Sequence, residues 1–374
     1  MEQRRAEYVR REIIRLCHAG LDSYTLRVET IKQLRKVIPI DVSFFATADP
    51  ATLLFTGAVQ DEILGHVTAQ FLENEFLRDD VNKFVWLARN TPPVGGLVQA
   101  TGQDLERSPR SREILTPLGL GDELRAALIT GGACWGFMCL HRDRSSPPFT
   151  AGEAAFLARL TPHLAEGLRK ALLISATTRP TLPDEPGVLL LAEDLSLAAI
   201  TPTAERWLAE VAAADWPRTQ QALPYAVEAA ARLQALERDS DMQPDLLPKV
   251  RLRTASGHWL VLHASRLGGP SAGGQIAVII EAARSAEVAP LIVQAYELSK
   301  REGEIMQSVL RGLSTAEIVA TLHISPNTVQ DHLKAIFEKV GVGSRRELVG
   351  QLFTQQYQPR MAAGRGLDSK GWFT

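Results

Sequence analysis

The chain has 374 residues, which at about 150 residues per domain predicts two or three domains and excludes a single small module. Hydrophobic residues make up 45% and charged residues 22%, a composition typical of globular proteins with buried cores. Lys and Arg number 41 against 43 Asp and Glu, a net charge of -2, which excludes a protein that coats nucleic acid non-specifically and leaves only local patches for DNA.

Neither a membrane helix nor a secretory signal is expected. The most apolar stretch, residues 126–140, is interrupted by glycines and is shorter than the roughly 20 residues that cross a bilayer. The charged N-terminus has no apolar core behind it. The cysteines Cys17, Cys134 and Cys139 lack metal or redox spacing. We therefore expect them to be buried, in a protein that works in a reducing cytoplasm.

The first segment, residues 1–176, mixes helical and strand patterns. Its helical patterns lie at 7–16, 22–37, 62–89 and 149–174. Its strand patterns lie at 42–48, 96–100, 124–130 and 135–140. Gly131 and Gly132 predict a hairpin turn between the last two strands. Thr150 and Glu153 predict a capping box at the start of the last helix.

Three prolines between residues 177 and 186 disfavour a helix and predict a linker. After it, strand patterns lie at 187–192, 196–200, 249–254, 259–267 and 275–281, and helical patterns at 202–211 and 225–236. They predict a small antiparallel sheet that holds two helices. The glycine-rich run 268–274 lacks the Lys and Ser/Thr of a phosphate-binding loop and precedes a strand, so a hairpin loop is expected there.

The third segment, residues 298–357, has the pattern of four short helices. Capping boxes are predicted for the pairs Ser299/Glu302, Ser314/Glu317 and Ser344/Glu347. Ser325 followed by Pro326 marks one more helix start, the third in chain order. Gly312 and Gly341 mark helix ends. Only His323 and Ile324 separate the second helix from the third start. Such a short connection makes the two helices cross steeply, as in a helix-turn-helix.

The helix predicted from Pro326 to Val340 has two faces. Val329, Leu333, Ile336 and Val340 share one apolar side. The polar residues Asn327, Gln330, Asp331 and Lys334 fall on the other side near the helix start, where a recognition helix presents groups to the major groove. Amides pair with adenine, Asp with cytosine, and Lys with guanine or phosphate. The alternative is a solvated face of a small helical bundle.

The runs 298–305, 312–333 and 336–345 resemble the LuxR-type (GerE-like) DNA-binding domain of bacterial transcription regulators. The resemblance implies a four-helix fold that binds paired half-sites of double-stranded DNA as a symmetric homodimer. It places the protein in a bacterial cytoplasm, away from membranes, and allows RNA polymerase as a further partner.

The family's Thr-Val-Lys-x-His pattern falls on residues 328–332, where Gln330 replaces the Lys and Asp331 adds a negative charge. Both departures predict weak DNA affinity per monomer. The expected DNA contacts are Thr315, Asn327, Thr328, Gln330, Asp331, His332, Lys334, Lys339, Ser344 and Arg345. The last helix carries Val349, Leu352 and Phe353, which the resemblance assigns to a dimer seam, with extra core packing as the alternative.

The runs 124–129, 135–142 and 149–153 resemble a GAF-type domain, and the layout of the second segment is similar to a PAS domain. The fold class expected is α+β multidomain. Its parts are a GAF-like domain at 1–176, a linker at 177–186, a PAS-like domain at 187–284, a linker helix at 285–297, the helix-turn-helix at 298–357 and a tail at 358–374.

GAF and PAS folds imply a pocket for a small ligand, or a dimerisation surface. Trp86, Trp135 and Phe137 are the candidate ligand contacts, although aromatic residues on strands commonly belong to the core. No haem, flavin or zinc motif is legible, and the eight histidines include no helical zinc pair. We expect no metal and no resident cofactor, and a small-molecule effector is left unidentified.

The sequence thus predicts a sequence-specific transcription regulator in which a sensory half controls a DNA reader. The alternative is a GAF-containing signalling protein or enzyme that uses the terminal helices as a protein-docking module. An enzyme requires catalytic carboxylates, a nucleophile or a metal cluster, and the sequence shows none, so no enzymatic activity is expected. A regulator whose first two segments only dimerise is a third possibility.

Overall fold

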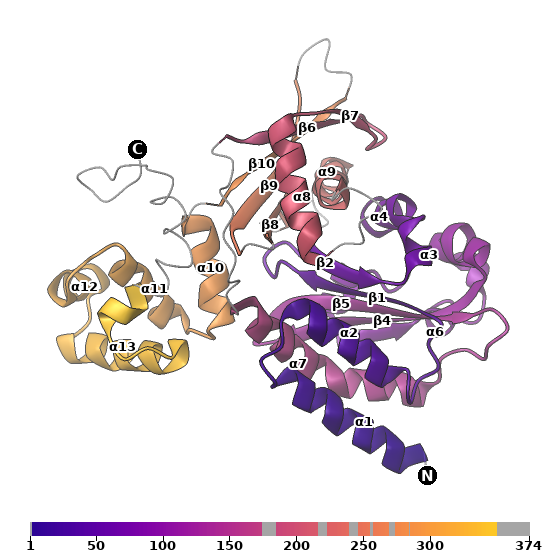
Figure 1. The fold of residues 1–374 in the computed structure, drawn as a ribbon, viewed down its shortest axis with the longest axis horizontal. Coiled ribbons are helices and arrows are strands. Elements are labelled where there is room, and N and C mark those ends of the chain that lie inside the picture. Colours follow the sequence, from indigo (N-terminus) through magenta and orange to yellow (C-terminus); the bar gives the residue numbers. More distant parts are fainter. Residues whose placement is uncertain are drawn as a thin grey trace. The chain divides into compact units, whose positions relative to one another are not determined.

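A computed structural model describes residues 2–173, 185–215, 223–238, 246–254, 257–268, 274–283 and 285–349. Most of residues 1–282 form one compact unit, and a second unit holds the residues from 283 onward. The first unit contains two five-stranded sheets, and the second is helical (Figure 1). No helix in the described ranges combines the length and apolar character needed to cross a membrane.

The first sheet is antiparallel, with strands in the order β2-β1-β5-β4-β3. The strands are β1 (Val42–Ala48), β2 (Phe55–Gln60), β3 (Val94–Gly96), β4 (Leu120–Thr130) and β5 (Ala133–Asp143). Gly131 and Gly132, with φ of 57° and 74°, form the turn of the β4–β5 hairpin, which confirms the predicted turn. Nearly every residue of β5 is buried, because both faces of the sheet are covered.

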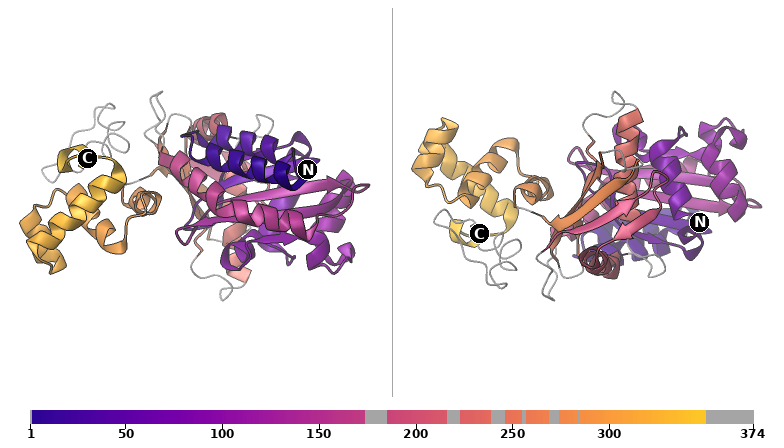
Figure 2. Two further views of the ribbon diagram at one scale, coloured as in Figure 1. Left: turned by 90° about the horizontal axis from the view of Figure 1, so that it is seen from below. Right: turned by 90° about the horizontal axis from the view of Figure 1, so that it is seen from above.

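Three helices cover one face of this sheet: α1 (Glu2–Cys17), α2 (Ser23–Leu34) and α7 (Ala151–Leu173) (Figure 2). The predicted capping box starts α7: Glu153 Oε2 accepts the Thr150 N–H at 2.8 Å, and Thr150 Oγ1 accepts the Glu153 N–H at 3.2 Å. Gly167 lets α1 approach α7 closely, because a Cβ there would lie 3.1 Å from Cys17. All three cysteines of the chain are buried free thiols, as expected.

The long helix predicted over residues 62–89 is wrong. The segment forms α3 (Glu62–Gly65), α4 (Thr68–Leu77) and α5 (Phe84–Arg89). Tertiary hydrogen bonds outweigh the helical periodicity here, since Glu75 Oε1 accepts the Phe84 N–H at 2.7 Å and so starts α5 separately. The predicted strand at 96–100 is also wrong, because the chain leaves β3 and forms α6 (Leu97–Ala100), next to the Asp122 carboxylate.

Short helical turns at Leu105–Arg107, Ser111–Leu115 and Thr116–Leu118 lead into β4. Together with α4, the turn at Ser111–Leu115 contributes apolar side chains to the sheet face opposite α7. An aromatic cluster lies on this side: the Phe84 and Phe137 rings stack with centroids 4.5 Å apart, and Phe55 meets both edge-on at 5.8 Å. The first sheet therefore has buried side chains packed on both of its faces.

The second sheet is antiparallel in the order β7-β6-β10-β9-β8. Its strands are β6 (Gly187–Leu191), β7 (Leu197–Ile200), β8 (Lys249–Arg253), β9 (Trp259–Arg266) and β10 (Ile276–Ala282). With α8 (Pro202–Asp215) and α9 (Leu223–Arg238), it confirms the predicted antiparallel sheet with two helices. The predicted proline linker and most of the glycine-rich run 268–274 lie outside the described residues.

Buried polar contacts join the two sheets within the first unit. The Arg251 guanidinium forms an ion pair with Asp49 at 2.5 Å, and both side chains are buried. Glu228 Oε1 on α9 accepts the N–H of Phe55, the first residue of β2, at 2.7 Å. Burial raises the pKa of Glu228 well above its ordinary value, although the Phe55 N–H and Arg232 act in the opposite direction.

The second unit begins with α10 (Ser285–Ala295), followed by α11 (Lys300–Leu310), α12 (Thr315–Leu322) and α13 (Pro326–Val340). Residues 345–349 are also helical, at the end of the described range. The buried hydrophobic residues of this unit include Ile305, Met306, Val309, Ile318, Val329, Leu333, Ile336, Val340 and Leu348. The predicted capping boxes at Ser299/Glu302 and Ser314/Glu317 are both present.

Candidate nucleic-acid interface

The helix end and the helix start on either side of the turn between α12 and α13 lie where the sequence predicts them. His323 ends α12 in the left-handed conformation, with φ of 54°, which turns the chain away from the helix axis. Ser325 caps α13, because its Oγ accepts the Thr328 N–H at 3.1 Å, and Pro326 occupies the first helical position. The free N-terminal end of α13 carries the positive end of the helix dipole, which favours negative charge nearby.

The two faces of α13 are separated as predicted. Val329, Leu333, Ile336 and Val340 are buried. Asn327, Gln330, Asp331 and Lys334 are exposed, and Thr328 and His332 are half-buried. The first two turns of α13 therefore present amide, carboxylate and ammonium groups together on an open surface.

Other predicted contact residues take part in the packing of the second unit. The Lys339 Nζ donates to Glu302 Oε2 at 2.7 Å and to the Glu297 carbonyl at 3.1 Å, and so ties α13 to the start of α11. Burial raises the pKa of Glu302, but hydrogen bonds from Lys339 and Ser299 outweigh it and hold that pKa below its ordinary value. The Arg345 guanidinium donates to the Leu313 carbonyl. DNA contacts by Lys339 and Arg345 stay predictions.

The third predicted capping box differs in detail. Ser344 Oγ accepts the Glu347 N–H at 3.1 Å, but Glu347 Oε2 accepts the N–H of Gly343 at 2.7 Å instead of that of Ser344. Thr315 is the first residue of α12 and is half-buried. Val349 is half-buried, and the other two predicted dimer residues, Leu352 and Phe353, lie outside the described residues.

One residue that fixes this geometry was missed in the sequence. Arg301 on α11 donates to the carbonyl of Leu322, the last residue of α12, at 2.9 Å. It also forms an ion pair with Glu304, three residues along the same helix, at 2.7 Å. A basic side chain placed where it can reach the end of another helix gives no periodic signal, so only the fold reveals this contact.

The candidate ligand contacts of the first unit separate into two groups. Trp86 is 54% exposed and lines a cavity of about 580 Å³ together with Lys83, Arg89 and, from α9, Leu236. Trp135 and Phe137 are buried core residues and are not among the residues that line this cavity. A second, much smaller cavity of about 30 Å³ lies between α4 and the first sheet.

Comparisons with known proteins show which family the helical unit resembles. Residues 296–351 match the family of bacterial regulatory proteins of the luxR type. The probable transcriptional regulatory protein NarL of Mycobacterium tuberculosis is 36% identical over 73 residues, 20% of this chain and 31% of that protein. The chain thus spans about a third of NarL. The spore germination protein GerE of Bacillus subtilis is 36% identical over 55 residues, 15% of this chain and 74% of that protein.

Among solved structures, the GAF domain/HD domain protein from Geobacter sulfurreducens overlaps 42% of this chain and 99% of its own length, with 17% identity and a TM-score of 0.32.

The matched residues 296–351 include the turn between α12 and α13 and the whole exposed face of α13. Through this segment the chain belongs to the luxR family of bacterial regulatory proteins.

Proposed function

We propose that the protein is a sequence-specific DNA-binding transcription regulator, which binds as a homodimer and is controlled by an N-terminal sensory region. One observation carries the proposal: the family segment presents Asn327, Gln330, Asp331 and Lys334 on an open face, directly opposite the buried stripe of α13. A helix with one buried and one exposed polar face after a tight turn suits insertion into the major groove.

Each exposed group has a chemistry that suits base edges or phosphates. The amides of Asn327 and Gln330 can pair with adenine through two hydrogen bonds, and Asp331 can accept from the cytosine amino group. Lys334 can reach guanine or a phosphate. Two polar amides and one acid beside one Lys make a poor electrostatic site, so we assign most of the discrimination to base contacts and to the pairing of two half-sites.

The sensory half consists, in this proposal, of a GAF-like domain at residues 1–176 and a PAS-like domain at 187–284. The cavity of about 580 Å³ supports a ligand site there, because it falls within the size range of small-molecule pockets. Trp86 offers an exposed aromatic surface, and the lining combines basic side chains such as Lys83 with acidic ones such as Asp79. The signal that this region detects sets the DNA affinity of the helical unit.

Binding of the full-length chain to fragments of its own genome tests the proposal. We expect the chain to enrich a small set of fragments, and the triple variant Asn327→Ala/Gln330→Ala/Lys334→Ala to lose that enrichment while its circular dichroism stays unchanged. Lys32→Ala, which removes an exposed lysine from α2 in the first unit, serves as the matched control and should bind like the parent. No enriched fragment, or equal enrichment by the triple variant, would overturn the proposal.

A further inference from the structure

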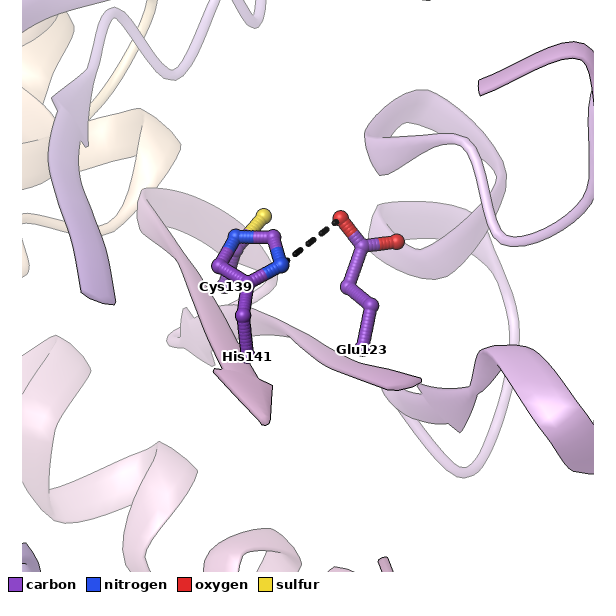
Figure 3. Close-up of side chains that lie close together, drawn as sticks. All are labelled: Glu123, Cys139 and His141. Atoms are coloured by element: carbon purple, nitrogen blue, oxygen red, sulfur yellow. Dashed lines mark ion pairs between the residues drawn. The ribbon is translucent and has the colours of Figure 1, made fainter. Parts of the chain in front are cut away.

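Three side chains that can bind metal ions meet on one face of the first sheet (Figure 3). Glu123 lies on β4, directly across from His141 on β5, and Cys139 lies two residues before His141 on the same strand. Residues two apart on a strand point to the same side, so the register brings all three together. Their ligand atoms lie within 4.8 Å of one another, and all three residues are buried.

Two of these polar atoms lack a hydrogen-bond partner among the described residues. They are Glu123 Oε1 and His141 Nδ1, which lie 3.9 Å apart. This separation is too long for a hydrogen bond. It is close to the roughly 3.4 Å between two ligand atoms that bind one tetrahedral ion at about 2.0–2.2 Å. Since buried polar atoms are rarely left unpaired, the pair points to a missing partner between them.

The surrounding charges orient Glu123 without using its free oxygen. The guanidinium groups of Arg110 and Arg125 both approach Oε2 of Glu123, at 2.8 and 3.0 Å. Each arginine also faces a second carboxylate: Asp80 lies 3.5 Å from Arg110, and Glu75 lies 2.7 Å from Arg125. Two guanidinium groups therefore hold Oε2 of Glu123 and leave its Oε1 facing His141, while Lys83 adds a third cation near Glu75 and Asp80. The arginines act as a supporting shell that fixes the carboxylate.

A small cavity adjoins two of the three residues. Cys139 and His141 line the cavity of about 30 Å³, together with apolar side chains such as Phe44, Phe71 and Leu115. A volume of about 10–15 Å³ is enough for one water molecule. The cavity therefore has room for a water molecule as the fourth ligand, and the polar side chains of Gln60 and Thr68 also line it.

We propose that Glu123, Cys139 and His141 bind one divalent first-row transition metal ion of the Zn²⁺ type, with a water molecule in the fourth position on the cavity side. An imidazole, a thiolate and a carboxylate form a set that suits such ions, and three protein ligands with one open position are typical of reactive sites. Binding releases the thiol proton of Cys139 to solvent. The proposal is independent of the proposed DNA binding.

Titration with Co²⁺ tests this site. The full-length chain, free of any added histidine tag, is reduced, cleared of metal with a chelator and titrated with Co²⁺ without oxygen. We expect one Co²⁺ per chain with a thiolate-to-cobalt charge-transfer absorption, and its loss when one equivalent of Zn²⁺ is added. Cys139→Ser should abolish that absorption, and His141→Gln should weaken Co²⁺ binding at least tenfold.

The double variant Cys17→Ser/Cys134→Ser is the matched control, because it leaves Cys139 as the single thiol of the chain. It should keep both the stoichiometry and the charge-transfer absorption, which assigns the thiolate even where Cys139→Ser fails to fold. Absence of the absorption in the parent chain would overturn the proposal and would leave a buried water between Glu123 and His141 as the missing partner. An unchanged absorption in Cys139→Ser, or its loss in the double variant, would overturn it equally.

Discussion

Lys334 and Asp331 carry opposite charges on the exposed face of α13, so we expect opposite effects on DNA affinity. Both side chains are exposed, so both are accessible to DNA in the proposed interface. A lysine that neutralises a phosphate releases condensed counterions, and an aspartate at the same surface repels the backbone. In the proposed interface we expect the balance between them to set how strongly the helical unit holds DNA of any sequence, and Asn327 and Gln330 to contribute to base discrimination.

Two substitutions at these positions should shift DNA affinity in opposite directions. Lys334→Ala should weaken binding to an enriched fragment and reduce the slope of log affinity against log salt by about 0.9, the value for one phosphate contact. Asp331→Asn should raise affinity for unrelated DNA and relax the preference at its base pair. Fluorescence anisotropy over a range of salt concentrations measures both, with Lys32→Ala as the control. Equal slopes for Lys334→Ala and the parent chain would contradict the phosphate contact.

The pairing of Glu123 with His141 could not be predicted from the sequence. The Gly131–Gly132 turn is visible in the sequence, and an undisturbed hairpin from that turn pairs Glu123 with Leu140. A register shift between Leu128 and Ile129 moves the partner to His141 instead. A β-bulge of this kind depends on local packing and has no reliable sequence signature. For this reason the spacing of Glu123, Cys139 and His141 in the sequence does not reveal that they lie together.

At the scale of elements, the helix caps and the bounds of α13 were predictable, and the breaks within the segment 62–89 were not. Ser299, Ser314 and Ser325 each cap a helix as their positions in the sequence predict, because a cap is a contact within four residues. The segment 62–89 failed for the opposite reason. Its continuity is broken by bonds such as that between Glu75 and the Phe84 N–H, in which the acceptor comes from another element.

The Ser325 cap should stabilise the first turn of α13. Ser325→Ala removes the acceptor of the Thr328 N–H and should cost about 1 kcal/mol of local stability. Amide hydrogen exchange in peptides that cover residues 325–332 should then quicken about fivefold. Ser325→Asp supplies a carboxylate acceptor in the same place and should restore slow exchange. Unchanged exchange in Ser325→Ala would mean that the packing of Val329 and Leu333 alone holds the first turn.

At the scale of the whole molecule, the net charge of -2 conceals differences between its parts. Residues 298–357 carry seven basic and six acidic side chains, so the helical unit is close to neutral. Two of its acids are committed elsewhere: Glu302 and Glu317 cap helices, and Glu302 also binds Lys339. The bulk charge disfavours non-specific coating of DNA, yet it leaves open a reader whose discrimination rests on amides.

The stability of the first unit should depend on pH, because its two sheets meet across buried ionisable groups. Glu228 on α9 is completely buried, and its carboxylate oxygen accepts the Phe55 N–H of the first sheet. Desolvation by burial raises its pKa well above the ordinary value, and Glu75 adds to the rise, whereas Arg232 opposes it. The folded chain therefore keeps this carboxyl protonated at a pH where the unfolded chain has already lost the proton.

This difference predicts how stability depends on pH. The contribution of Glu228 is fully present below the unfolded pKa of about 4.5 and is lost as the pH rises toward the raised folded value, by about 1.4 kcal/mol for each pH unit. Glu228→Gln keeps an oxygen acceptor for the Phe55 N–H but has no proton to lose. It should therefore be more stable than the parent chain at pH 8 and similar to it at pH 4. Urea unfolding at both values measures this, with Glu237→Gln, on the surface of the same helix, as the control. A parallel pH dependence in Glu228→Gln and the parent chain would show that ionisation of Glu228 does not weaken the junction between the two sheets.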